Sequence, residues 1–165
     1  MSEHKFTALA ALVCDDVRNE LSGKEILIGV FADNVYVGGI PANLGVCLYL
    51  RALFARTEVS NIKFRVLGPS GIQVTPEASI PIPGPPDLAF VTSIVVRGVN
   101  FQAQAEGRYE FQWQPPEQEW ETVTSLRIKK GNAPPLSVTL APASIAGRPQ
   151  PEQSPPAVPV SASPP

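Results

Sequence analysis

The sequence predicts an all-β protein, an antiparallel two-sheet sandwich of immunoglobulin-like or jelly-roll-like type, followed by a disordered proline-rich C-terminal tail. Residues 108–113 alternate strictly, with Tyr109, Phe111 and Trp113 on one face and polar side chains on the other. This period of two is typical of a half-buried strand. Further runs rich in β-branched and aromatic residues recur at intervals of about ten residues, separated by turn signals. Short strands at that spacing favour a sandwich.

The first predicted element is a hairpin around Ser22-Gly23, which separates two strand-like runs. With these two residues at the centre of the turn, Glu20 lies opposite Glu25, and Asp16 lies opposite Gly29. Charged side chains then alternate in sign along one face of the first strand. We expect that face to be solvated and to protect a sheet edge.

The segment 44–56, LGVCLYLRALFAR, suits either a helix or a strand. Its leucines and alanines favour a helix, whereas every second residue from 46 to 54 is apolar, which gives a strand one apolar face. We favour the strand, because the neighbouring segments are strands and a lone helix needs a further layer to cover.

Four further strands and one crossing complete the predicted domain. Residues 68–71, GPSG, predict a second hairpin between residues 62–67 and 72–74. The runs 88–99 and 120–130 are predicted strands. Residues 76–86 contain five prolines, and proline lacks the N–H that a sheet ladder needs, so we expect an extended crossing between the sheets or along an edge.

The composition changes near residue 132. Residues 133–165 contain ten of the 19 prolines, no aromatic residue, and only Arg148 and Glu152 as charged residues. Such a segment cannot bury enough apolar surface to offset its conformational entropy. We therefore predict a sandwich domain over residues 1–132 and a disordered tail over 133–165. Within the tail, only residues 136–140, LSVTL, suit an edge strand.

Charge and hydropathy argue against two classes of partner. The formal net charge of -2 provides no basic field for a phosphate backbone, so we expect no nucleic acid. No run approaches the ~20 apolar residues of a membrane span, so we expect no membrane association. The N-terminus has only a short apolar stretch and no small-residue cleavage pattern, which predicts an unexported, cytoplasmic protein.

The two cysteines, Cys14 and Cys47, have apolar sequence neighbours. They are predicted to be small core hydrophobes with reduced thiols. A bridge between them stays open, because the sequence does not give their distance.

Asp15, Asp16 and Arg18 form the one polar cluster that suggests either a structural or a functional role. Asp15 alternates in step with Val13 and Val17, which directs its carboxylate towards the core. A buried carboxylate needs backbone N–H donors or a cation. We therefore expect a structural anchor, unless a bulge between residues 14 and 17 reverses the facing. The candidate cationic partners are Arg51, Arg65 and Arg97.

No catalytic, cofactor-binding or metal-binding residues are predicted. Nucleophilic catalysis generally needs a positioned base, and the single histidine, His4, lies in the N-terminal segment. One histidine and two cysteines without close spacing do not suit zinc. Asp33 lies several residues along the predicted hairpin from Asp15, and no D-x-D-x-D loop is present, which argues against calcium.

Trp113 and Trp120 flank a Pro-Pro-Glu-Gln-Glu turn. Both suit ordinary core positions. If they are exposed together, they form an aromatic platform for a partner.

The opening string ALVCDDVRNELSGKEILIGVFAD, followed by LYLRALF, IKFRVLGPSG and FQAQAEGRYEFQW, resembles a family of small, uncharacterised bacterial proteins, a domain of unknown function. The family opens with a similar A-L-[IV]-C-D-D-[IV]-R pattern and carries a late G-x-Y-x-F strand, here Gly107, Tyr109 and Phe111. The resemblance spans residues 11–130. It implies a compact β-sandwich in the bacterial cytoplasm with no established activity, and it supplies no catalytic residues.

Together these observations predict a non-enzymatic binding or assembly module that acts through protein–protein contacts. The predicted contacts are a sheet edge or the loops near Trp113, Trp120 and residues 76–86. The alternative is a metal-dependent or carboxylate-based enzyme or binder centred on Asp15, Asp16 and Arg18.

Overall fold

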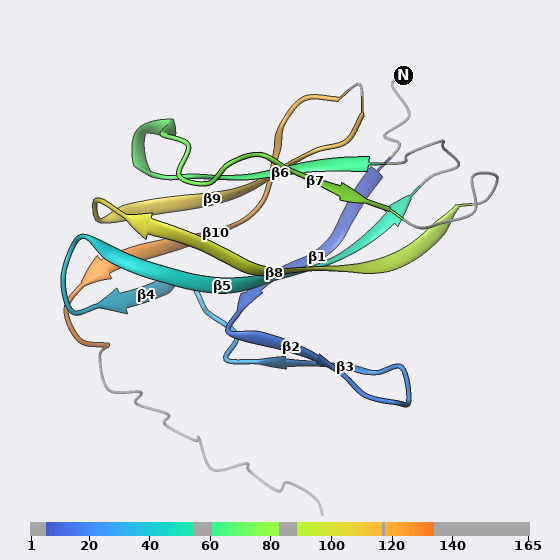
Figure 1. The fold of residues 1–165 in the computed structure, drawn as a ribbon, viewed down its shortest axis with the longest axis horizontal. Coiled ribbons are helices and arrows are strands. Elements are labelled where there is room, and N and C mark those ends of the chain that lie inside the picture. The colour runs from blue at the N-terminus through green and yellow to red at the C-terminus, as the bar shows by residue number, and fades with distance from the viewer. Residues whose placement is uncertain (1–5, 55–60, 83–88, 117, 134–165) are drawn as a thin grey trace, which may run out of the picture. The chain divides into compact units, whose positions relative to one another are not determined.

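The computed structural model describes residues 6–54, 61–82, 89–116 and 118–133 (Figure 1). Within these ranges the regular structure consists of ten strands and one short 3-10 turn, Pro69–Gly71. The strands are β1 Phe6–Cys14, β2 Asp16–Asn19, β3 Glu25–Ile28, β4 Asn34–Val37, β5 Ala42–Phe54, β6 Asn61–Leu67, β7 Ala78–Pro81, β8 Phe90–Ala103, β9 Gly107–Gln114 and β10 Glu121–Lys130. The predicted all-β class is confirmed.

Two sheets enclose one core. A three-stranded antiparallel sheet has the order β1-β5-β8, and a five-stranded sheet has the order β4-β10-β9-β6-β7. The buried apolar cluster draws side chains from both sheets. Phe101 of β8 meets Phe111 of β9 edge-on, with ring centroids 6.4 Å apart and an interplanar angle of 78°. The sandwich architecture therefore follows from apolar faces that can be buried only against each other.

The ambiguous segment 44–56 is a strand over its described part. Alternate residues of β5 are buried on the inner face, with exposed fractions of 3% or less. They are Val46, Leu48, Leu50, Ala52 and Phe54. Full burial of one leucine side chain stabilises the fold by roughly 1.5–3 kcal/mol. The period of two, and not the helix propensity of leucine and alanine, decides the conformation, since β5 lies between two partner strands.

The alternation of β9 is also confirmed. Tyr109, Phe111 and Trp113 are buried, whereas Arg108 is exposed. Gln112 departs from the pattern, because it lies on the outer face and is nevertheless only 9% exposed.

The first hairpin is shorter than predicted and has a different register. Arg18 pairs with Ile26, and Asn19 pairs with Glu25, so the predicted pairing of Glu20 with Glu25 is wrong. The N–H of Glu20 instead donates to the carbonyl of Lys24 at 2.8 Å. The loop has three residues, 21–23, and ends in Gly23 with φ 80°, a left-handed position that favours glycine.

The hairpin also does not continue into β1. The chain bends at Asp15, and β1 pairs with β5. The β2–β3 hairpin forms its own two-stranded sheet (Figure 1). Val17 therefore packs with Cys14 and Cys47, away from the main core to which Val13 belongs.

The second predicted hairpin is confirmed, since the chain reverses through Pro69–Gly71 and the N–H of Val74 donates to the carbonyl of Val66 at 2.9 Å. Of the predicted crossing, Ala78–Pro81 lies as β7 on the edge of the five-stranded sheet beside β6. Residues 83–86 of that crossing lie outside the described residues, as does the predicted tail beyond Ala133 with its segment 136–140.

One pairing departs from a purely antiparallel arrangement. β4 lies parallel to β10, with Val35 opposite Ile128. The N–H of Arg127 donates to the carbonyl of Asp33 at 2.8 Å, which extends this pairing by one residue. A two-residue turn cannot produce a parallel pair, so long-range packing sets this contact. Among the described residues, no helix has the length and hydropathy to cross a membrane.

Cys14 and Cys47 lie directly opposite each other in β1 and β5, and both are free and buried. They lie on the outer face of the three-stranded sheet, where the β2–β3 hairpin covers them with Val17 and Leu27. Arg97 of β8 holds the hairpin in place, since its Nη2 donates to the carbonyl of Val17 at 2.9 Å. The prediction that both cysteines are buried is confirmed.

Burial raises the pKa of the Cys14 thiol, and the neighbouring Cys47 raises this pKa further. Below about pH 8.5 a thiol is protonated in both the folded and the unfolded chain. Above that pH the unfolded chain ionises first, so the folded state binds more protons and the free energy of unfolding falls by about 1.4 kcal/mol per pH unit. Urea denaturation at pH 8, 9 and 10 measures this slope, and Cys14→Ala is expected to flatten it. An equal slope in both proteins would contradict the assignment to Cys14.

Candidate functional site

The predicted polar cluster is exposed. Asp15 lies in the bend between β1 and β2 and is exposed, so the expectation of a core-directed carboxylate is wrong. The reason is the bend itself, which reverses the facing between Cys14 and Val17. The N–H of Asp15 donates to the carbonyls of Ile28 and Gly29 at 3.0 and 3.3 Å, which fixes the bend against β3.

Asp16 and Arg18 lie on the outer face of the hairpin. Arg18 Nε is 3.1 Å from Asp16 Oδ2, and the two side chains are 70% and 43% exposed. Asp16 Oδ1 also accepts a hydrogen bond from the N–H of Val17 at 2.8 Å. An ion pair this exposed contributes at most about 1 kcal/mol. Asp33 is not part of this cluster, because it lines a pocket with residues of β9 and β10.

Among residues 6–54, 61–82, 89–116 and 118–133, no group of three or more histidine, cysteine, aspartate or glutamate side chains is placed to hold a metal ion.

Trp113 is completely buried and packs edge-on against Phe64, with ring centroids 5.7 Å apart. It therefore belongs to the core and cannot form an aromatic platform with Trp120. Trp120 is half-buried and immediately precedes β10. The two tryptophans lie in different environments, because the strand alternation of β9 directs Trp113 between the sheets.

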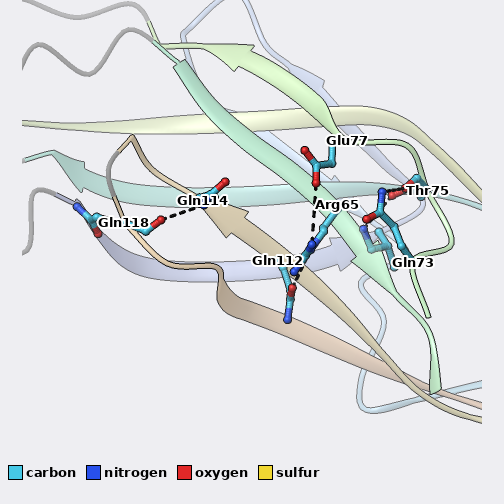
Figure 2. Close-up of polar contacts among 8 residues, drawn as sticks. Arg65, Gln73, Thr75, Glu77, Gln112, Gln114 and Gln118 are labelled. Carbon is cyan, nitrogen blue, oxygen red and sulfur yellow. Dashed lines mark hydrogen bonds and ion pairs between the residues drawn. The ribbon is translucent and has the colours of Figure 1, made fainter. Parts of the chain in front are cut away.

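Arg65 is the centre of a polar network on the outer face of the five-stranded sheet. Its guanidinium lies over the ring of Trp120, 3.9 Å from the ring centroid. Its Nε donates to Gln112 Oε1 at 3.0 Å, and its Nη1 lies 3.9 Å from Glu77 Oε1. Figure 2 shows Arg65 between Gln112 of β9 and Glu77, which precedes β7. Arg65 of β6 thus contacts β9, the residue before β7 and the half-buried tryptophan.

The network extends across β9 to β10. Gln112 Nε2 donates to Thr122 Oγ1 at 3.2 Å and to Glu110 Oε2 at 3.3 Å. Glu110 also accepts from Thr122 at 3.1 Å and lies 3.4 Å from Arg108 Nε. These bonds satisfy the buried amide of Gln112 and explain why a polar side chain is tolerated there. The network stabilises the sheet and holds no group in a position to react.

An open pocket of about 450 Å³ lies beside the predicted contact loops. It is lined by Lys63 of β6, Ser79 of β7 and the turn residues Gln114, Pro115, Pro116 and Gln118, together with Asn61. Gln114 Nε2 donates to the carbonyl of Gln118 at 3.1 Å and closes the turn (Figure 2). The structure thus brings Pro115, Pro116 and Gln118 next to Ser79 of the 76–86 segment.

The sequence did not indicate the outer face of the three-stranded sheet. Four of its apolar side chains are between 36% and 52% exposed. They are Leu9, Leu12, Leu53 and Val91, and we call this set the outer apolar face. Residues 47, 49, 51 and 53 alternate with the buried positions of β5, and that alternation is the signal that could have located this face.

Residues 9–129 match a family of unknown function, DUF6941. The chain belongs to this family. The match covers both sheets and the β2–β3 hairpin of the DUF6941 domain, and it confirms the resemblance to a domain of unknown function. A comparison with curated proteins gave no match.

Proposed function

We propose that this DUF6941 protein is a non-enzymatic binding or assembly module of the bacterial cytoplasm that docks a protein partner on the outer apolar face. The observation that supports this most is the exposure of four large apolar side chains on one side of one sheet. Single exposed leucines need no explanation, but a contiguous set on a sheet face is typical of an interaction surface.

The register places Leu53 and Val91 directly beside each other and Leu12 on the same face two rows along the sheet. Leu53 of β5 lies between Thr7 of β1 and Val91 of β8. Two rows further along the sheet, Tyr49 lies between Leu12 and Val95. Directly opposed side chains on one face of a sheet lie within contact distance of each other. Tyr49 and Val95 also pack against the cluster of Cys14, Val17 and Cys47, so the exposed part of this surface consists of Leu53 and Val91 with Leu9 and Leu12 of β1.

Arg51 gives this surface a polar centre. It lies between Ala10 and Ser93, in the row that separates the Leu53 row from the Tyr49 row. Arginine at the middle of an apolar surface is characteristic of interface hot spots, since its guanidinium binds a carboxylate with two parallel hydrogen bonds. The proposed partner is therefore a protein that presents apolar side chains around one carboxylate.

The β8 strand places a sheet edge next to this face. β8 is 14 residues long and has a described partner, β5, on one side. Edge strands pair with segments of other proteins, and neighbouring side chains add specificity. Val91 and Val95 lie on the same strand as this edge, so a partner that adds to β8 also reaches the outer apolar face.

Two further observations support the remaining parts of the proposal. Cys14 and Cys47 are opposed and unbridged, which suits a reducing compartment such as the cytoplasm. The alternative function, an enzyme or metal-dependent binder at Asp15, Asp16 and Arg18, receives little support, because these residues are largely solvated and Asp33 lies in another pocket. We assign residues 133–165 the role of a spacer.

The test uses the full chain with a photo-crosslinking residue at position 12 and, as a control, at position 72. Ile72 is 66% exposed but follows the Pro69–Gly71 turn, on the other sheet. We expect a protein adduct from position 12 in cells, with the mass distinguishing another protein from a second copy of the chain. Equal adducts from both positions would contradict the proposal.

Substitutions on this face measure how much individual side chains contribute to the complex. Val91→Lys and Leu12→Lys are each expected to weaken the crosslinked complex at least about tenfold, because a buried lysine opposes apolar contact. Ile72→Lys is expected to leave the complex unchanged. All three variants alter exposed positions, so their free energies of unfolding should stay within about 0.5 kcal/mol of the unsubstituted protein. Complexes that survive both Val91→Lys and Leu12→Lys would exclude the outer apolar face.

A further inference from the structure

We propose that the protein binds a phosphate group in a pocket on the outer face of the five-stranded sheet, between β4, β9 and β10. The pocket has a volume of about 380 Å³. It is lined by Arg108, Arg127, Lys129, Ser125, Asn34 and Asp33, and we call it the Arg127 pocket. This site is separate from the proposed protein-binding face, which belongs to the other sheet.

The strand register gathers the cationic side chains. Arg127 of β10 lies between Arg108 of β9 and Asn34 of β4. Ser125 and Lys129 are two residues before and after Arg127 on the same strand, so they point to the same face. Two guanidinium groups, one ammonium, one hydroxyl and one amide therefore converge on one pocket.

The positive charge of this pocket is not balanced within the described chain. Arginines directly opposite each other on neighbouring strands destabilise a sheet. Arg108 has a carboxylate partner, Glu110, at 3.4 Å. Neither Arg127 nor Lys129 has an ion pair with a described carboxylate; the Lys129 ammonium lies 6.0 Å from the centroid of the Tyr36 ring. Arg108, Arg127 and Lys129 face two carboxylates, Asp33 and the Glu110 that pairs with Arg108, which leaves a local excess of one positive charge, although the formal charge of the whole chain is -2.

The donor set suits a tetrahedral oxyanion. Guanidinium groups bind phosphate oxygens with paired hydrogen bonds, and lysine adds a point charge. Ser125 and Asn34 add neutral donors for the remaining oxygens. The pocket volume lies in the range of small-molecule sites, about 300–1,000 Å³, so the phosphate can be free or can belong to a small ester. The carboxylate of Asp33 repels an anion. Removing its charge therefore tests whether the phosphate binds in this pocket.

The experiment measures binding of inorganic phosphate and of glucose 6-phosphate to the full chain by calorimetry and thermal unfolding. Sodium chloride holds the ionic strength constant, and glucose serves as the uncharged control. We expect both phosphates to bind and to raise the thermal midpoint, whereas chloride and glucose do not. Tighter binding of glucose 6-phosphate than of inorganic phosphate would identify an ester as the ligand class, and the reverse would identify free phosphate.

Four variants locate the site. Arg127→Gln and Lys129→Gln are each expected to weaken phosphate binding at least tenfold. Asp33→Asn is expected to strengthen it, because one repulsive charge is removed. Lys63→Gln, which makes the same charge change on the outer face of the same sheet at β6, should leave the affinity unchanged.

A stability measurement separates loss of the site from loss of the fold. Without phosphate, Arg127→Gln is expected to raise the thermal midpoint by about 1–3 °C, since it removes the repulsion from Arg108. Equal effects of phosphate and chloride on the unsubstituted protein would overturn the proposal. So would phosphate binding that Arg127→Gln and Lys63→Gln change by the same factor.

Discussion

Replacing Trp113 by alanine is expected to lower the free energy of unfolding by about 3–5 kcal/mol. The side chain is 0% exposed and contacts Phe64 within the core between the two sheets. Interiors are packed like organic crystals, so the sheets cannot close over the volume that the indole leaves. Guanidinium denaturation followed by circular dichroism measures the change, and the denaturant midpoint is expected to fall without a change in slope.

Trp120→Ala is the matched control for this substitution. Trp120 is half-buried and its ring contacts the Arg65 guanidinium, so alanine removes one cation–π contact and part of a side chain's burial. We expect a loss of about 1 kcal/mol. Equal losses for the two tryptophans would contradict the assignment of Trp113 to the core and of Trp120 to the surface network.

Gly29→Ala is expected to lower the free energy of unfolding by about 2–3 kcal/mol. Gly29 has φ 62°, a left-handed conformation that costs a residue with a Cβ about 1–2 kcal/mol. An added Cβ would also lie 2.6 Å from Cγ and 3.1 Å from Cβ of Asp15. The substitution therefore disturbs the bend that places the β2–β3 hairpin. Urea denaturation measures the loss.

Two comparisons separate the causes of that loss. Gly38→Ala is expected to be nearly neutral, because Gly38 has no positive φ and no atom within 4 Å of an added Cβ. Asp15→Ala combined with Gly29→Ala should recover part of the loss, because the carboxylate contact is gone while the backbone strain stays. Strict additivity of the two single effects would exclude the contact with Asp15 as a cause.

The strands that alternate most clearly were predicted from the sequence. β5 and β9 follow a period of two over most of their length, and each residue on the inner face adds burial that favours the same register. The prediction for residues 44–56 succeeded because five inner positions agree with one another. Helix propensity could not outweigh that consistency.

The first hairpin shows that alternation does not determine the register between two strands. A turn of two or three residues is compatible with Ser22-Gly23, and the choice shifts every cross-strand pair by one residue. The bend at Asp15 depends on hydrogen bonds from its N–H to the carbonyls of Ile28 and Gly29. The sequence does not indicate which residues of these two segments lie opposite each other. The parallel pairing of β4 with β10 joins residues more than 90 positions apart, so it could not be predicted from local alternation either.

The candidate surfaces were predicted less well than the fold. The sequence indicates which residues share a face of a strand, but it does not indicate which outer face is covered. Trp113 and Trp120 therefore looked equivalent, although one is buried between the sheets and the other stacks on Arg65. Arg65 was considered only as a partner for Asp15, and its real partners, Gln112 and Glu77, become neighbours only when the five-stranded sheet forms.

The order of strands in the five-stranded sheet has a consequence for synthesis on the ribosome. β9 and β10 occupy the middle of that sheet, between β4 on one side and β6 on the other, yet they are the last strands of the described residues. While the chain is growing, β4 lacks its partner β10, and β6 lacks its partner β9. The five-stranded sheet therefore completes only after Lys130 has left the exit tunnel, and until then the strands β4 and β6 keep unpaired edges that favour aggregation.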